Sequence, residues 1–123
     1  MQQTITVLED LQIIQVESSG DATAEEHKAC LYAVLKIRQD RGLTRVFVDA
    51  TKETSIPKTI PMFEFGSHLA SRVKGMRFAV ATSPVMLDGL AFLQTVVFNR
   101  GGLLRVFDSV DAALAWLTEE PNK

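Results

Sequence analysis

The last quarter of the chain, residues 99–117, constrains the fold more than any other stretch. Gly101 follows Asn99-Arg100 and is a natural helix stop, because glycine readily adopts the positive φ found after a helix C-terminus. Residues 103–107 form a short apolar run, typical of a strand buried on both faces of a parallel sheet. Asp108 or Ser109 then caps a helix. Its apolar residues recur at helical spacing and are Val110, Ala113, Leu114 and Leu117.

The rest of the chain repeats this alternation of strand and helix. We expect strands at residues 4–8, 11–16, 45–50, 76–82 and 103–107, and helices at residues 23–41, 59–74, 84–99 and 109–117. Glu9-Asp10 reads as a tight turn that joins the first two strands into a hairpin. The pattern predicts an α/β fold of order β-β-α-β-α-β-α-β-α. Its five-stranded, mostly parallel mixed sheet is packed with four helices.

Size and composition predict one soluble domain over residues 1–123. Hydrophobic residues make up 46% of the chain and charged residues 23%, as in ordinary globular proteins. The net charge of -2 gives no nucleic-acid footprint, and no apolar run approaches the ~20 residues of a transmembrane helix. Cys30, the single cysteine, excludes an internal disulfide, and the N-terminus does not read as a signal peptide. We therefore expect a cytoplasmic protein.

Three segments resemble the STAS-like family, the relatives of the sporulation anti-sigma-factor antagonist, and most closely its small stand-alone bacterial branch. They are Val46-Phe47-Val48-Asp49 with the later Pro57, the strand Phe78-Ala79-Val80, and the stretch from Asn99-Arg100-Gly101 through Arg105-Val106-Phe107 to Trp116-Leu117. The resemblance implies a five-stranded sheet packed with helices and a regulatory or interaction role rather than catalysis. Antagonists of this family are switched by phosphorylation of a serine in an Asp-Ser-Ser sequence after the third strand. This chain has Asp49-Ala50-Thr51 there.

Hydroxyl side chains follow the predicted strands at the edge where open α/β sheets bind ligands. Thr51, Thr54, Ser55 and Ser83 are candidates for phosphorylation or for binding a small anion, because helix N-termini offer free N–H groups. The alternative is plain N-capping, which uses the same residue types. Asp49 either contacts a ligand or, as such residues more often do, satisfies backbone N–H groups in a turn.

Sequence spacing indicates no metal site, cofactor or catalytic residue. His27 and His68 are far apart, and neither has a convincing ligand three or four residues away. Gly101-Gly102 precedes a strand and so does not match a dinucleotide-binding loop. We expect a protein that is not an enzyme and needs no cofactor.

Apolar residues crowd two predicted helices more densely than one helix face can bury. The candidate interface residues are Met62, Phe63, Phe65 and Phe92. The leading hypothesis is a non-enzymatic STAS-like regulatory domain that docks a protein partner through residues 51–59 and the helix at 59–74, or pairs as a homodimer. The alternative is a small-molecule or lipid carrier with a pocket beneath the helix at 59–74, whose ligand would be a small anion or a lipid.

Overall fold

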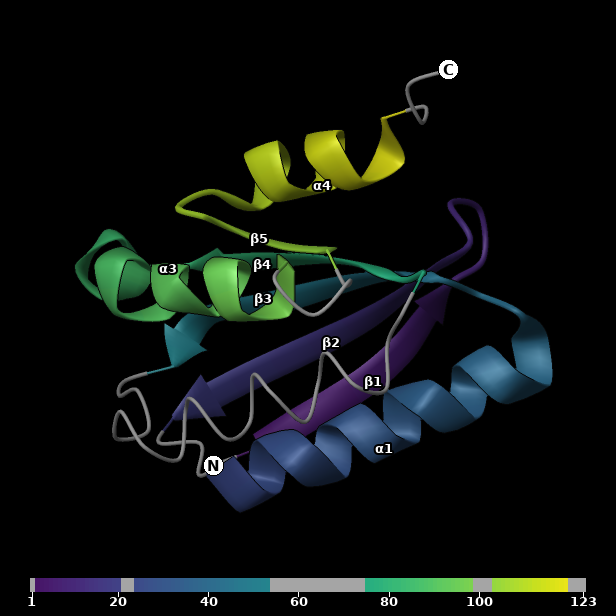
Figure 1. Cartoon of the computed structure of the whole chain (residues 1–123). Coiled ribbons are helices and arrows are strands. Elements are labelled where there is room, and N and C mark those ends of the chain that lie inside the picture. The colour runs from purple at the N-terminus through teal and green to yellow at the C-terminus, as the bar shows by residue number, and fades with distance from the viewer. Residues whose placement is uncertain (1, 21–23, 54–74, 99–102, 120–123) are drawn as a thin grey trace.

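The computed structural model describes residues 2–20, 24–53, 75–98 and 103–119 (Figure 1). In chain order the elements are β1 (Gln2–Leu8), β2 (Ile13–Gly20), α1 (Ala24–Arg41), β3 (Arg45–Glu53), β4 (Arg77–Thr82), α3 (Pro84–Phe98), β5 (Leu103–Phe107) and α4 (Val110–Thr118). This order matches the prediction for every described element. The fourth expected helix, at residues 59–74, lies outside the described residues.

The five strands form one sheet in the order β1-β2-β3-β4-β5, so chain neighbours are also sheet neighbours. β1 runs antiparallel to β2, with Ile5 opposite Val16. The other neighbours are parallel, with Val48 of β3 lying between Val16 of β2 and Val80 of β4. The sheet is therefore mixed, with its antiparallel strand at one edge, as predicted.

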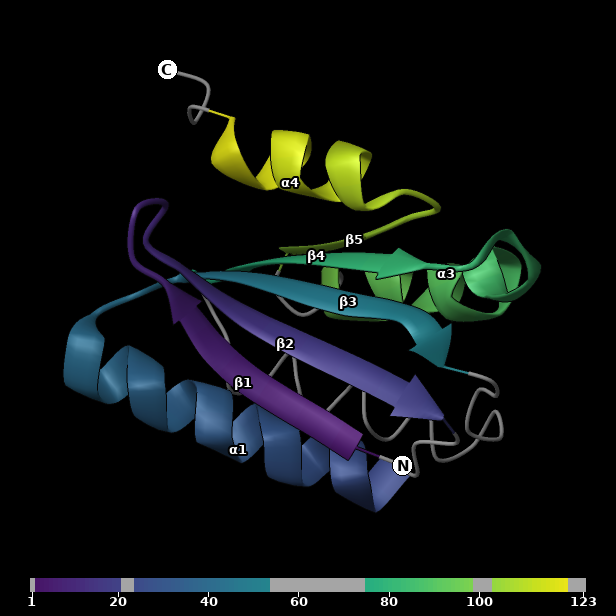
Figure 2. The same cartoon turned by 180° about the vertical axis from the view of Figure 1, so that it is seen from behind.

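The helices divide between the two faces of the sheet (Figures 1 and 2). Right-handed crossovers between successive parallel strands place their connecting helices on the same face, which accounts for α1 and α3 lying together. α4 follows the last strand, so no crossover constrains it, and it packs on the opposite face against β3, β4 and β5. The central strands are consequently covered on both sides.

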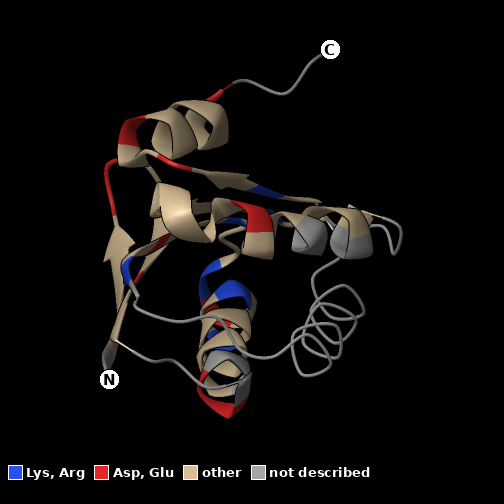
Figure 3. Cartoon of the chain, turned by 90° about the vertical axis from the view of Figure 1, so that its left-hand side faces the viewer, with Lys and Arg blue, Asp and Glu red and all other residues tan. Residues whose placement is uncertain are grey.

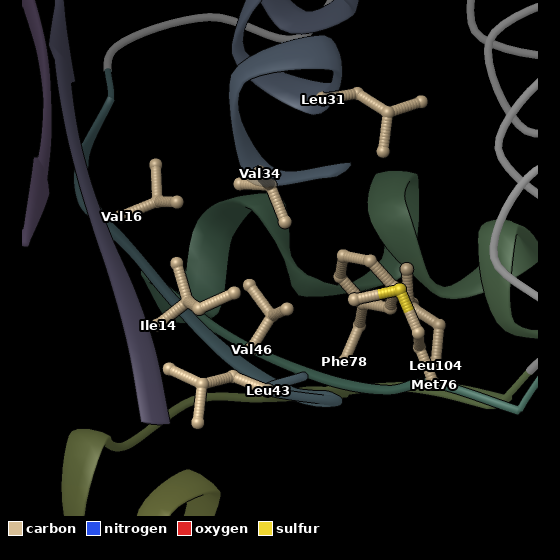
Figure 4. Close-up of a cluster of buried hydrophobic side chains, with 9 residues drawn as sticks. All are labelled: Ile14, Val16, Leu31, Val34, Leu43, Val46, Met76, Phe78 and Leu104. Atoms are coloured by element: carbon tan, nitrogen blue, oxygen red, sulfur yellow. The ribbon is translucent and has the colours of Figure 1, made fainter. Parts of the chain in front are cut away.

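The larger core lies between the sheet and α1 (Figure 4). Leu31 and Val34 of α1 point toward the sheet, where Val46 is fully buried. The buried residues of this cluster are Ile14, Val16, Leu31, Val34, Leu43, Val46, Met76, Phe78 and Leu104. Because successive strand residues point to opposite faces, the neighbours of these residues supply a second core under α4. Its buried members are Ile13, Phe47, Ala79, Ala81, Ala113 and Leu117.

Local sequence signals set the ends of the helices. α1 carries Glu25 and Glu26 in its first turn and Arg38 and Arg41 in its last turn, the order that complements the helix dipole (Figure 3). It ends at Gly42, which has a φ of 72° and donates its N–H to the Arg38 carbonyl. At the start of α4, Ser109 is the N-cap, and its hydroxyl accepts the N–H of Ala112 at 3.0 Å. Of the two predicted caps, Asp108 and Ser109, the structure uses Ser109.

Three strand predictions need correction. The strand predicted at 11–16 is Ile13–Gly20, so the hairpin turn spans residues 9–12 instead of Glu9-Asp10 alone, and Ser18 and Ser19 lie within β2. The predicted strand at 45–50 continues to Glu53, so Thr51 lies within β3 and not in a loop. The strand at 103–107 was predicted to be buried on both faces, but of its residues only Leu104 is fully buried, and Arg105 is exposed. β5 is an edge strand that α4 covers only in part, because α4 also spans β3 and β4.

Candidate functional site

The carboxyl ends of β2, β3 and β4 meet at one edge of the sheet, because the three strands are parallel. Ser19, Thr51 and Ser83 occupy this edge, the first two near the ends of β2 and β3 and the third directly after β4. The structure thus brings two of the predicted site residues, Thr51 and Ser83, to the same edge. Thr54 and Ser55 lie outside the described residues.

A local irregularity between β2 and β3 shapes the middle of this edge. Glu17 pairs with Asp49, but Ser19 pairs with Lys52, so β3 holds one residue more than β2 over this interval. Such bulges re-aim side chains and are common beside functional sites. Here the Asp49 carboxylate satisfies the backbone locally, since its Oδ1 accepts the Thr51 N–H at 3.1 Å and the Thr51 hydroxyl at 2.6 Å. Asp49 therefore does what the structural alternative predicted, and it holds Thr51 in place.

A polar pocket of about 150 Å³ opens beside this bulge. Strands β1, β2 and β3 supply its lining residues, which are Thr4, Glu17, Ser18, Ser19, Asp49 and Lys52. Glu17, Thr4 and Lys52 are exposed, whereas Ser18 is buried and its Oγ accepts a hydrogen bond from the Gln3 amide at 3.4 Å. The pocket is large enough for a small polar group, such as one side chain of a partner, but not for a dinucleotide.

The charges of the pocket favour a cationic group over an anion. Glu17 and Asp49 are direct neighbours on adjacent strands and share a face of the sheet. Like charges placed opposite each other on a sheet repel and lower stability. An anion bound here would add to this repulsion, whereas a cation would relieve it. The negative charge of the pocket therefore disfavours the predicted anion site at Thr51. Lys52 is the only lining residue that carries positive charge.

Ser83 lies at a separate point of the edge, at the start of α3. Its carbonyl accepts the Met86 N–H at 3.0 Å, and Pro84 is the first helical residue, as the Ser-Pro pair predicts. The preceding Thr82 is fully buried, and in the described part of the chain its hydroxyl has no hydrogen-bond partner. Ser83 stays a candidate anion site as a prediction.

The predicted interface falls largely beyond what the structure describes. Met62, Phe63 and Phe65 lie outside the described residues. Phe92 lies within α3, but its side chain is not described. Elsewhere on α3, Val85 and Phe98 are strongly exposed, at 92% and 68%. The helix therefore presents apolar side chains at both of its ends.

Sequence reasoning placed Ser18-Ser19 at this edge as hydroxyl residues that follow a strand, but it missed Glu17 and Lys52 as parts of the same site. The signal was present in β2, where Gln15, Glu17 and Ser19 are polar at every second position after Ile13. This spacing puts them on the same face of the sheet as α4. Because α4 covers only the β3–β5 side, that polar row remains accessible.

Neither a metal centre nor a membrane-spanning helix is found among the described residues. Within the ranges that the structure covers, no three His, Cys, Asp or Glu side chains lie close enough to hold a metal ion. None of the described helices has the length and apolar character needed to cross a membrane.

Comparison with known proteins supplies the family. Residues 13–118 match the model of the SpoIIAA-like family. A protein of the DUF3478 family from Shewanella loihica PV-4, described as uncharacterized and having a SpoIIAA-like fold, superposes with a TM-score of 0.57 at 17% sequence identity. The match covers 94% of this chain and 92% of that one, and at this identity it shows a shared fold. No curated protein matches. The family match spans all the elements from β2 to α4, so the chain belongs to the SpoIIAA-like family.

Proposed function

We propose that this protein is a non-enzymatic interaction domain that regulates a protein partner by docking it at the carboxyl edge of the sheet. The observation that carries the proposal is the pocket lined by Glu17 and Asp49, beside the Asp49–Thr51 hydrogen bond. Membership of the SpoIIAA-like family supports a docking role. The docking surface would continue into residues 51–59 and the expected helix at 59–74, which includes Phe63 and Phe65.

The negative charge of the pocket indicates the charge of the partner side chain that would bind there. Two carboxylates on adjacent strands repel each other and are partly desolvated when a partner covers them. A lysine or arginine side chain of the partner would neutralise that repulsion and form charge-assisted hydrogen bonds. We therefore infer a partner with a basic side chain at the centre of its docking surface.

Thr51 is where modification would act on this interaction. Its hydroxyl donates to Asp49, so a phosphoryl group on Thr51 would remove that bond and place new negative charge beside the carboxylates. The hydrogen-bonded arrangement at the bulge would be lost, and the electrostatic potential at the pocket would become more negative. Phosphorylation at Thr51 stays a proposal, as it does at Thr54 and Ser55.

Partner capture with charge-reversed baits tests the docking site. The test variant is Glu17→Lys, and the matched control is Asp10→Lys, which makes the same charge change in the turn before β2, at the opposite end of that strand. Partners captured from a lysate of the source organism are identified, purified and titrated against each bait. Since a close interfacial charge pair contributes more than about 1.5 kcal/mol, Glu17→Lys should weaken binding at least tenfold.

The control separates loss of docking from a change in net charge. Asp10→Lys should bind like the wild type, because Asp10 lies far from the pocket. Equal affinity of Glu17→Lys and wild type for every captured partner would reject docking at this edge. The alternative function, a carrier of a small molecule or a lipid, depends on the space beneath the expected helix at 59–74. It therefore stays a prediction, which native mass spectrometry of the freshly purified protein tests.

A further inference from the structure

The two edge strands of the sheet, β1 and β5, differ in how they are protected against pairing with another chain. At the β5 edge, the side-chain amide of Gln94 in α3 accepts the backbone N–H of Val106 at 2.6 Å. α3 packs along β5, and β5 also carries the charged Arg105. A blocked backbone group and a charged side chain are two of the devices that prevent an edge strand from pairing with another chain. The β5 edge is therefore protected against pairing with a further strand.

The β1 edge carries none of these devices. Its seven residues, Gln2–Leu8, include no charged residue, no proline and no glycine. All seven pair with β2 in continuous register, so β1 has no bulge that would twist it away. In an antiparallel pair, every second residue directs its N–H and C=O away from the partner strand. Among the described elements β1 has only β2 as a strand neighbour, so these outward groups form a row of donors and acceptors along the edge.

The sequence of β1 suits pairing with itself. An antiparallel pair of β1 strands related by a two-fold axis at Ile5 would place Thr4 opposite Thr6 of the second copy, and Gln3 opposite Val7. No charge meets a like charge in this register. Both members of each pair also lie on the same face, so Ile5 and Val7, which pack at the margin of the α1 core, stay on the α1 face in both copies.

We propose that a second copy of this chain docks on β1. The two β1 strands would pair antiparallel about a two-fold axis at Ile5, and this seam would join the two sheets into one continuous sheet. The occupant is a second copy because the neutral Thr-Ile-Thr centre is compatible with two-fold symmetry, the commonest symmetry of soluble dimers. Main-chain hydrogen bonds supply the attraction, as in other complexes formed by strand addition. This surface adjoins the carboxyl-edge pocket of the proposed function, because Thr4 belongs to both. Both test variants below carry the same residue at position 4, so their comparison does not depend on the pocket.

Sedimentation velocity over a concentration series tests the seam with two matched variants. Thr4 and Thr6 are both exposed, so charges placed there leave the two cores intact. In Thr4→Lys/Thr6→Lys, the register sets lysine against lysine at two points, and the dimer dissociation constant should rise at least about tenfold. In Thr4→Lys/Thr6→Glu, the same register sets opposite charges together, and the dissociation constant should stay within about threefold of the wild type. Circular dichroism confirms that each variant is folded.

The sign of the charge at position 6 is the only difference between the variants. Within one copy, Thr6 lies opposite the neutral Gln15, so that difference has little effect on folding. A wild-type protein that is monomeric at every concentration overturns the proposal. So does a dimer that survives equally in both variants, because its contact would then lie elsewhere than β1.

Discussion

At the scale of single residues, Arg77 ties the start of β4 to the end of α4. Its guanidinium donates to the carbonyl of Trp116 at 3.0 Å and to that of Glu119 at 3.3 Å. The same group lies 4.5 Å from the centre of the Trp116 ring. It thus caps carbonyls at the negative end of the α4 dipole and also contacts an aromatic face. The Phe107 ring also packs against Trp116, with 5.8 Å between the two ring centres.

We expect Arg77→Lys to lower the free energy of unfolding by about 1–2 kcal/mol. Lysine keeps the charge but loses the planar fork that reaches two carbonyls while stacking on the ring. Arg105→Lys is the matched control, because Arg105 lies 5.7 Å from the same ring but is exposed, and a few tenths of a kcal/mol are expected. Urea unfolding, monitored by the fluorescence of Trp116, the only tryptophan, measures the free energy of unfolding of both variants. Equal losses in the two variants would contradict a capping role for Arg77.

The residues that sequence reasoning placed well are those whose partners are close in the chain. Asp49 accepts a backbone N–H two residues away, and Ser109 caps a helix three residues away, as their types and positions predict. Arg77 and Trp116 are 39 residues apart, so their contact depends on where α4 packs. The pocket residues are missed for the same reason, since Glu17 and Asp49 become neighbours only through the register of β2 and β3.

At the scale of elements, the order of strands and helices was predictable because turns and caps mark it locally. Gly42 and Gly75 both adopt a positive φ, of 72° and 84°, which is the conformation that makes glycine a helix or turn terminator. The burial of β5 was not predictable. An apolar pentapeptide looks the same at the centre and at the edge of a sheet, and only the strand order decides between them.

α4 has nine residues and is too short to be stable alone, so its N-cap should be measurable. Ser109→Ala removes the acceptor for the Ala112 N–H and should lower the free energy of unfolding by about 1 kcal/mol. Ser109→Asp retains an acceptor and adds negative charge at the positive end of the helix dipole. Its free energy of unfolding should therefore equal or exceed that of the wild type. Chemical denaturation of the three proteins gives the comparison. A Ser109→Asp variant as unstable as Ser109→Ala would show that the hydroxyl acts in another way.

At the scale of the whole molecule, one sheet separates two cores that share the same strands. Val46 and Phe47 are consecutive in β3, yet the first is buried against α1 and the second under α4. Loss of order in β3 would therefore expose apolar surface on both faces at once. This coupling predicts that the α1 layer and the α4 layer unfold in one transition rather than in sequence.

A matched pair of core truncations tests this coupling. Leu31 of α1 and Leu117 of α4 are both buried, one in each core, and Leu→Ala at either position should cost about 2–5 kcal/mol. Trp116 fluorescence reports the α4 face, whereas far-ultraviolet circular dichroism reports all the helices, of which α1 is the longest described. If the two cores unfold together, Leu31→Ala shifts the Trp116 transition as far as the dichroism transition, although Leu31 lies on the other side of the sheet. Separate midpoints for the two probes in either variant would instead show that one layer can open while the other stays folded.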